Sequence, residues 1–181
     1  TDGSAELCEK LASTDDRIKV FHKENGGAAS AKNYAYKHAS ADWIVHCDAD
    51  DSYDLNAVEL LVDAQRKHDA DLVLGALRLC PKVEKAKRNS ANELSGSLID
   101  TRDLLEKFYY TDKTTFIDTL PGKLMRKEHL LKYPAPEGKI YEDFAIMPWV
   151  FSECKKVFFS TDHIYNYYQS PNSVMRSKFS D

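Results

Sequence analysis

A cluster of carboxylates is the strongest chemical signal in this sequence. Asp48, Asp50 and Asp51 lie within four residues of one another, directly after the apolar run 43–47. If that run is a strand, the cluster lies at its carboxyl end, which is where ligands bind in open α/β sheets. Crowded carboxylates repel one another, and a bound cation relieves the repulsion. We therefore predict a site for Mg²⁺ or Mn²⁺, ions that can stabilise a departing diphosphate.

Two simpler interpretations of the same residues stay open. In the first, the segment is an acidic turn in which Asp51 or Asp54 caps the following helix. The second is a calcium-binding EF-hand loop, but Tyr53 occupies the sixth position, where that loop needs glycine. The oxygen-bearing residues at the ligand positions of such a loop are Asp48, Asp50, Ser52, Asp54, Asn56 and Glu59.

A phosphatase of the haloacid-dehalogenase type is the main competing enzyme class. Residues 48–52 match its D-x-D-x-[ST] motif, in which the first aspartate, here Asp48, attacks phosphorus. These enzymes also carry a later glycine-aspartate metal motif, and no Gly-Asp pair occurs in this chain. The phosphatase interpretation therefore ranks second.

Three further segments carry groups suited to ligand contact. Asp143 follows Glu142 at the start of an apolar stretch, where it is a candidate general base, or the pair simply caps a helix. Lys32, in an alanine-rich segment, is suited to pairing with an anionic group as a point charge, or it is an exposed lysine. The turn at Asn25 and Gly26 brings backbone close to a ligand, or it is a plain turn.

The elements that must position these residues alternate in the first half of the chain. We expect helices at 5–12 and 28–39 and strands at 18–21, 43–47 and 72–79. After Asp54 we expect an amphipathic helix, in which the residues at helical spacing are Val58, Leu61, Val62 and Gln65. Strands that alternate with helices are typical of an α/β fold with a largely parallel sheet.

The second half is less regular. We expect an exposed, lysine-rich loop at 81–92 and helices at 99–110, 124–132 and 142–153, the last kinked near Pro148. Two short strands are expected at 157–159 and 164–168. Core packing is the favoured use of Tyr165, Tyr167 and Tyr168, and stacking on a sugar is the second possibility. The 181 residues contain no internal repeat or linker and have the length of one domain.

Composition narrows the function. The chain is 43% hydrophobic and 30% charged, and its net charge of −4 argues against a nucleic-acid binder. No apolar run approaches the ~20 residues of a membrane-spanning helix. The four cysteines form no C-x-x-C pair, which favours a reduced cytosolic setting. The six histidines form no metal-binding pattern, and we expect His46, in the apolar run, to be a core or supporting residue.

In their order and spacing, these segments resemble the inverting GT-A glycosyltransferases of family two. Residues 1–4 are similar to the family's D-G-S-T-D-G-S-type start, 25–33 to its N-x-G-x-x-x-A-[RK]-N segment and 48–51 to its D-A-D-D motif. Later come an N-K-L-like segment at 122–124, the Y-E-D motif at 141–143 and a tyrosine-rich stretch with a trailing serine and arginine at 165–176. The resemblance covers essentially the whole chain.

The resemblance implies a nucleotide-diphospho-sugar transferase fold, in which a mostly parallel, Rossmann-like sheet is flanked by helices. It also implies roles for single residues. Asp48 is similar to the aspartate that contacts the donor's ribose or sugar, Asp50 to the metal-binding aspartate and Asp143 to the catalytic base. Donor contacts are further implied for Lys32, Asn25 and Gly26, and a lid over the diphosphate for Ser173 and Arg176.

The activity implied by the resemblance is metal-assisted sugar transfer, with inversion, from a nucleoside-diphosphate sugar to a saccharide or lipid-linked acceptor. The implied setting is the assembly of a bacterial surface polysaccharide in the cytoplasm, with peripheral association at the inner face of the membrane. Family members begin with a strand ending in P-x-Y-N-like residues, a helix and a second strand, which would all precede Thr1. We therefore expect residues 1–181 to be a single catalytic domain that lacks this N-terminal strand, helix and strand. The donor sugar, the linkage and the oligomeric state are not indicated.

Overall fold

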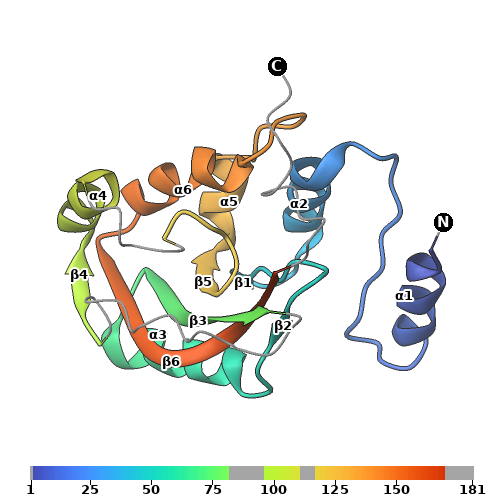
Figure 1. Ribbon diagram of the computed structural model, residues 1–181, viewed down its shortest axis with the longest axis horizontal. Coiled ribbons are helices and arrows are strands. Elements are labelled where there is room, and N and C mark those ends of the chain that lie inside the picture. Colours follow the sequence, from blue (N-terminus) through green and yellow to red (C-terminus); the bar gives the residue numbers. More distant parts are fainter. Residues whose placement is uncertain (1, 82–95, 111–116, 170–181) are drawn as a thin grey trace.

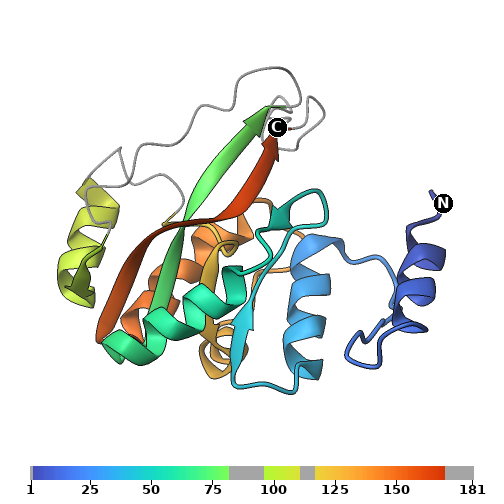
Figure 2. The same cartoon turned by 90° about the horizontal axis from the view of Figure 1, so that it is seen from below.

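The computed structural model describes residues 2–81, 96–110 and 117–169, which form a mixed β-sheet with helices on both faces (Figures 1 and 2). In chain order the elements are α1 (Ser4–Ala12), α2 (Gly27–His38), β1 (Trp43–Val45), β2 (Ser52–Tyr53), α3 (Ala57–His68), β3 (Leu72–Pro81), β4 (Leu98–Asp100), α4 (Thr101–Tyr110), β5 (Lys123–Arg126), α5 (Lys127–Lys132), α6 (Glu142–Ser152) and β6 (Lys156–Gln169).

The sheet has the strand order β1-β5-β3-β6-β2, and β4 pairs with the start of β6. Only β3 and β6 pair in parallel among the described strands, and the other ladders are antiparallel. The prediction of a largely parallel sheet is therefore wrong. β1 and β3 do run in the same direction, as expected for strands joined through a helix, but β5 enters between them from much later in the chain.

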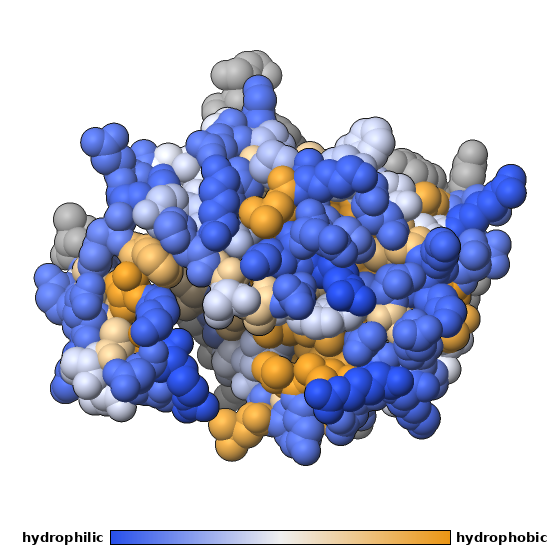
Figure 3. Space-filling view, turned by 180° about the vertical axis from the view of Figure 1, so that it is seen from behind, coloured by the Kyte–Doolittle hydropathy of each residue, from blue (hydrophilic) through white to orange (hydrophobic). Residues whose placement is uncertain are grey.

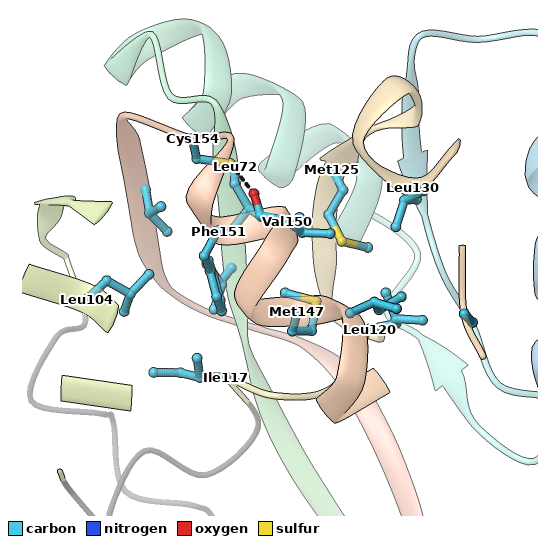
Figure 4. Close-up of a cluster of buried hydrophobic side chains, with 14 of the residues drawn as sticks. Leu72, Leu104, Ile117, Leu120, Met125, Leu130, Met147, Val150, Phe151 and Cys154 are labelled. Carbon is cyan, nitrogen blue, oxygen red and sulfur yellow. Dashed lines mark hydrogen bonds between the residues drawn. The ribbon is translucent and has the colours of Figure 1, made fainter. Parts of the chain in front are cut away.

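Two hydrophobic clusters cover the two faces of the sheet. Because side chains alternate along a strand, Leu72 and Leu74 point into one cluster and Val73 into the other. The larger cluster packs the sheet against α4, α5 and α6, and Figure 4 shows Met147, Val150 and Phe151 of α6 at its centre. The smaller cluster packs α3 against the opposite face. The molecule thus has three layers, with the sheet in the middle.

Most predicted helices are present, with corrections in the second half. Residues 98–100 and 123–126 are the strands β4 and β5, so the helices predicted at 99–110 and 124–132 begin later, as α4 and α5. The two short strands predicted after residue 156 form one long curved strand, β6 (Figure 1). Pro148 lies inside α6, as expected. Among the described residues, no helix is both long enough and apolar enough to cross a membrane.

The first helix lies apart from the rest of the domain. No residue of α1 is buried, and residues 13–26 lead from it to α2 without forming the strand predicted at 18–21. Phe21 instead stacks on His38 of α2, with ring centroids 4.6 Å apart. Figure 3 shows a groove between α1 and the body of the domain, whose apolar lining includes Leu11, Ile18 and Tyr34.

We predict that Gly75→Ala destabilises the domain. Gly75 lies at an irregularity in the pairing of β3 with β6, and a Cβ added there would be 2.2 Å from Cδ1 and 2.4 Å from Cγ1 of Ile164, which is fully buried. Such overpacking costs roughly 1–3 kcal/mol of unfolding free energy, measured by urea denaturation. In an Ile164→Ala background the clash is relieved, so the same substitution should cost much less. Equal costs in both backgrounds would contradict the prediction.

Candidate active site

The side chain of Lys32 gathers carboxylates from two distant segments. Its Nζ lies 2.7 Å from Oε1 of Glu142, 2.9 Å from Oδ1 of Asp143 and 4.0 Å from Oδ1 of Asp48. The lysine side chain is only 10% exposed, so the interpretation of Lys32 as an exposed surface lysine is wrong. Three of the residues singled out in the sequence, Lys32, Asp48 and Asp143, therefore lie together in the structure.

Helix α2 places Lys32 at this point because of its residue spacing. Ala29 and Tyr36 are buried, and they precede and follow Lys32 by three and four residues, which puts all three on one face of the helix. The same face carries Asn33, whose side-chain amide donates to the carbonyl of Ala135 at 2.8 Å and accepts from its N–H at 2.9 Å. Asn33 thus ties α2 to the loop that leads to Glu142 and Asp143.

The charges of the cluster stabilise one another. Burial by itself would lower the pKa of Lys32, but the carboxylates of Asp143, Glu142 and Asp48 outweigh it and raise the pKa above its ordinary value. Burial would likewise raise the pKa of Asp48 and of Glu142. Both pKa values are nevertheless lowered. For Asp48 the hydrogen bond and the charge of protonated His46 outweigh burial, with a smaller contribution from the charge of Lys32. For Glu142 the hydrogen bond from Lys32 is the main opposing cause.

Asp143 is held through both of its oxygens. Oδ1 accepts from Lys32, and Oδ2 accepts from the backbone N–H of Leu120 at 3.1 Å. Asp143 and Glu142 lie in the first turn of α6, where the helix dipole favours negative charge. Tyr141 precedes them with φ of 61°, a left-handed conformation that is uncommon for a residue other than glycine. The carboxylate therefore has a fixed orientation at the start of a helix.

Asp48 is supported by a histidine and a tyrosine. Nε2 of His46 lies 3.0 Å from Oδ1 of Asp48, and Nδ1 of His46 lies 3.4 Å from the hydroxyl of Tyr36. A neutral imidazole that donates to Asp48 through Nε2 accepts from Tyr36 through Nδ1. His46 is partly buried and orients Asp48, which confirms the expectation that it is a supporting residue.

Asp51 has a structural task. Its Oδ2 accepts from the hydroxyl of Tyr165 at 2.7 Å and its Oδ1 from the backbone N–H of Tyr168 at 2.8 Å, and the Tyr165 hydroxyl also accepts from the N–H of Asp48. Burial and the nearby carboxylates raise the pKa of Asp51. Asp51 thus ties the acidic segment to β6 and does not cap α3. Tyr165 is only 1% exposed, so core packing is confirmed for this tyrosine.

Asp54 does not cap a helix, and the acidic segment does not form a calcium loop. The side chain of Asp54 accepts from Nδ2 of Asn166 at 2.9 Å, and α3 begins at Ala57 without a side-chain cap. Ser52 and Tyr53 form β2, paired with β6, in the middle of the stretch that an EF-hand would use as its loop. Both the capping role of Asp54 and the EF-hand interpretation are therefore wrong.

Asp50 is the carboxylate left for a cation. It is exposed, and its side chain forms no hydrogen bond or ion pair with the rest of the described chain. Residues 2–81, 96–110 and 117–169 contain no group of three or more side chains that could hold a metal ion by themselves. Mg²⁺ is commonly held by one or two carboxylates together with substrate phosphates and water, and Asp50 beside Asp48 fits that mode.

The remaining predicted residues lie elsewhere. Asn25 and Gly26 precede α2, where Oδ1 of Asn25 accepts from the N–H of Gly27 at 3.0 Å, and neither residue contacts the Lys32 cluster in the described part of the chain. Their donor-binding role stays a prediction. Ser173 and Arg176, predicted to form a lid, lie outside the described residues.

Sequence reasoning gave no role to the turn 117–122, which contacts both halves of the site. Leu120 reaches Asp143 as described, and the N–H of Gly122 donates to the hydroxyl of Tyr53 at 2.9 Å. That hydroxyl donates to the carbonyl of His46 at 2.9 Å. The only signal for this turn in the sequence was the N-K-L-like segment at its end.

Comparison with known proteins identifies the family and the fold of this chain. The model of the family described as "Glycosyl transferase family 2" matches residues 1–133. Glycosyltransferase GlyG of Streptococcus pneumoniae is 28% identical over 99% of this chain, and a cholesterol galactosyltransferase of Borreliella burgdorferi is 25% identical over 97% of it. The chain spans 61% and 51% of the lengths of these two relatives.

Solved structures show the same fold. The crystal structure of S. aureus TarS 1–349 in complex with UDP-GlcNAc superposes with a TM-score of 0.76 at 19% identity, covering 99% of this chain and 50% of that one. The complex of TarS 1–349 with UDP superposes with a TM-score of 0.73 at 20% identity, covering 94% of this chain and 49% of that one. Since the family model matches well over half of its residues, the chain belongs to glycosyl transferase family 2, and its fold is of the GT-A type.

Proposed function

We propose that this chain forms the catalytic core of a glycosyltransferase that moves a sugar, with inversion, from a nucleoside diphosphate to an acceptor hydroxyl. The convergence of Asp48 and Asp143 on the ammonium of Lys32 carries this proposal. It brings Asp48, a carboxylate beyond the end of a strand that is suited to holding the donor, next to Asp143, a carboxylate suited to act as a base. Membership of glycosyl transferase family 2 supports the reaction class.

The substrates follow from the relatives and remain part of the proposal. TarS has been solved with UDP-GlcNAc and with UDP, which supports a nucleoside-diphosphate sugar as donor. One relative is named as a cholesterol galactosyltransferase, so a lipid-linked acceptor is as consistent as a saccharide. We place the reaction in the synthesis of a bacterial surface polysaccharide in the cytoplasm, with peripheral association at the membrane.

In the proposed reaction Asp143 is the general base. Its carboxylate takes the proton of the acceptor hydroxyl while the hydroxyl oxygen forms a bond to the anomeric carbon. The bond from that carbon to the diphosphate breaks on the opposite face, and the nucleoside diphosphate leaves with the electron pair. Lys32 and the N–H of Leu120 hold the two oxygens of Asp143, so that the base is already oriented before the acceptor arrives.

Charge at the leaving group is the second requirement. We propose that Asp50 would hold Mg²⁺ or Mn²⁺, which supplies positive charge to the diphosphate when it is bound. Asp48, fixed by His46, would contact the ribose or sugar of the donor. A phosphatase that uses Asp48 as nucleophile is not favoured, because the family match points to sugar transfer. Asp48 is also engaged in a hydrogen bond with His46.

Asp143→Asn should lower kcat by roughly 10²–10⁴-fold, the usual contribution of a general base, with little change in donor affinity. The amide keeps the shape of the side chain, and the proposed metal ligand is a different residue, Asp50. Glu142→Gln is the matched control, because it makes the same change of charge against the same lysine and should have a much smaller effect on kcat. Steady-state kinetics and donor calorimetry distinguish the two. A collapse of donor affinity with Asp143→Asn would make this residue a binding group instead.

Asp50→Ala should abolish turnover of the nucleotide sugar in Mn²⁺ while leaving the fold intact, because it removes the exposed carboxylate that follows β1. Release of nucleoside diphosphate measures turnover, and circular dichroism measures the fold. Asp63→Ala, at another aspartate, on α3, is the control and should keep full activity. Unchanged turnover with Asp50→Ala would remove the metal assignment.

Lys32→Met should lower the free energy of unfolding by about 3 kcal/mol near pH 7, since it leaves two largely buried carboxylates, Glu142 and Asp143, uncompensated. The pKa values of Asp48 and Glu142 are lowered on folding, so their contribution is present above the ordinary values of 3.8 and 4.5 and is lost as pH falls below them. The pKa of Lys32 is raised, so its contribution is lost as pH rises beyond the ordinary 10.5.

Urea denaturation of the two proteins across pH tests this pattern. The difference between wild type and Lys32→Met should be largest between these limits and shrink on both sides. Lys37→Met changes an exposed lysine of the same helix and should show no such window. A difference that stays constant with pH would show that Lys32 acts through packing alone.

A further inference from the structure

Lys123 is a buried lysine that the proposed reaction does not yet use. It is 2% exposed, and no other lysine, arginine, aspartate or glutamate is buried among the residues whose burial the structure describes. An ammonium group taken out of water is costly unless it is hydrogen-bonded. Lys123 is the first residue of β5, and its side chain reaches back toward the preceding turn, residues 117–122. Its partners therefore indicate what it is for.

The hydrogen bonds of Lys123 go to groups on both sides of Leu120. Nζ of Lys123 donates to the carbonyl of Thr119, and it lies 3.4 Å from the carbonyl of Pro121 and 3.4 Å from the hydroxyl of Thr119. These groups lie in a largely buried turn, where a carbonyl without a donor costs free energy. The ammonium thus fixes the backbone immediately before and immediately after Leu120.

The turn held in this way reaches both halves of the site. The N–H of Leu120 donates to Oδ2 of Asp143, and the side chain of Leu120 lies beside Met147 of α6, the helix that carries Asp143 (Figure 4). Two residues later, the N–H of Gly122 donates to the hydroxyl of Tyr53, which in turn donates to the carbonyl of His46. A displacement of the turn would therefore move Asp143 relative to His46 and its partner Asp48.

The carboxylates near the site also act on Lys123. Burial lowers the pKa of Lys123 to about 7, and the carboxylates of Asp143 and Asp118 act in the opposite direction. If Lys123 only filled space, an apolar side chain of the same length would serve as well and would avoid the cost of burying an ammonium. A buried polar group that bonds to the carbonyls of one turn points to a requirement for that turn's geometry.

We propose that Lys123 is a positioning residue for the transfer reaction. Its ammonium holds the turn 117–122 so that the N–H of Leu120 fixes the carboxylate of Asp143 at a set place relative to Asp48. In this role Lys123 acts through Asp143 and not by contact with the donor or the acceptor. This inference rests on the proposed role of Asp143 as the base.

A double-mutant cycle in the whole protein tests the inference. Lys123→Met keeps the length of the side chain and removes its donors. It should lower kcat between about 10-fold and 10²-fold, the cost of a misplaced catalytic group, and leave the donor KM within about twofold. In an Asp143→Asn background the same substitution should have almost no further effect on kcat, because the group it positions is already lost.

Lys127→Met is the matched control. Nζ of Lys127 also donates to a backbone carbonyl, that of Ala39 at 3.1 Å, but it lies outside the site and should leave kcat unchanged in both backgrounds. Equal losses of kcat from Lys123→Met in both backgrounds would overturn the inference, and so would no loss in either. If Asp143→Asn itself left kcat unchanged, the base assignment would fail first, and the positioning role would fall with it.

A second variant covers the case in which Lys123→Met does not fold. Replacing Leu120 by its α-hydroxy acid turns one backbone amide into an ester. It removes the N–H that donates to Asp143, and it weakens the Thr119 carbonyl as an acceptor for Lys123, so both changes fall on the proposed link from the turn to the base. This protein should lose kcat when residue 143 is aspartate and not in the Asp143→Asn background. If the ester kept full kcat, the link from the turn to the base would be absent and the inference would be wrong.

Discussion

The ion cluster around Lys32 is the interaction on which the rest of the site depends. One ammonium group faces Glu142, Asp143 and Asp48, and Asp50 and Asp51 lie close by in sequence. The cluster therefore carries an excess of negative charge. A diphosphate brought to this place would be repelled unless a further cation accompanied it, which is a physical reason to expect a divalent ion beside Asp50. The single positive charge of Lys32 pairs with the carboxylates of the cluster and does not also offset the negative charge of a diphosphate.

The mixed sheet explains how these groups come together. β1 and β3 run in the same direction but are not direct neighbours, because β5 lies between them. The insertion of β5 brings the end of the turn 117–122 between β1 and β3, because this turn leads directly into β5. From there its N–H groups reach Asp143 on one side and Tyr53 on the other. The antiparallel strand that the sequence analysis missed is thus the element that connects the two halves of the site.

Local patterns predicted the parts of this site but not their partners. The acidic segment after an apolar run and the carboxylates at the start of α6 were visible because each is a short contiguous signal. The ion pairs of Lys32 join residues 110 and 111 positions apart, and no spacing rule links them. Most of β5 fell within the helix predicted at 124–132. Lys123, Leu124 and Met125 are buried on both faces of the sheet, so this strand lacks the alternation of a half-exposed strand, and the leucines of α5 continue a helical pattern.

The two lysines of the site solve different problems with the same functional group. Lys32 compensates charge, and its partners include Asp48 and Asp143, the carboxylates that belong to the proposed chemistry. Lys123 compensates carbonyl groups, which are backbone atoms that carry no chemistry themselves. Both lysines nevertheless act on one carboxylate, because Oδ1 of Asp143 accepts from Lys32 and Oδ2 from the turn that Lys123 holds. The orientation of that carboxylate is consequently set by two separate parts of the fold, and folding and site geometry rest on the same contacts.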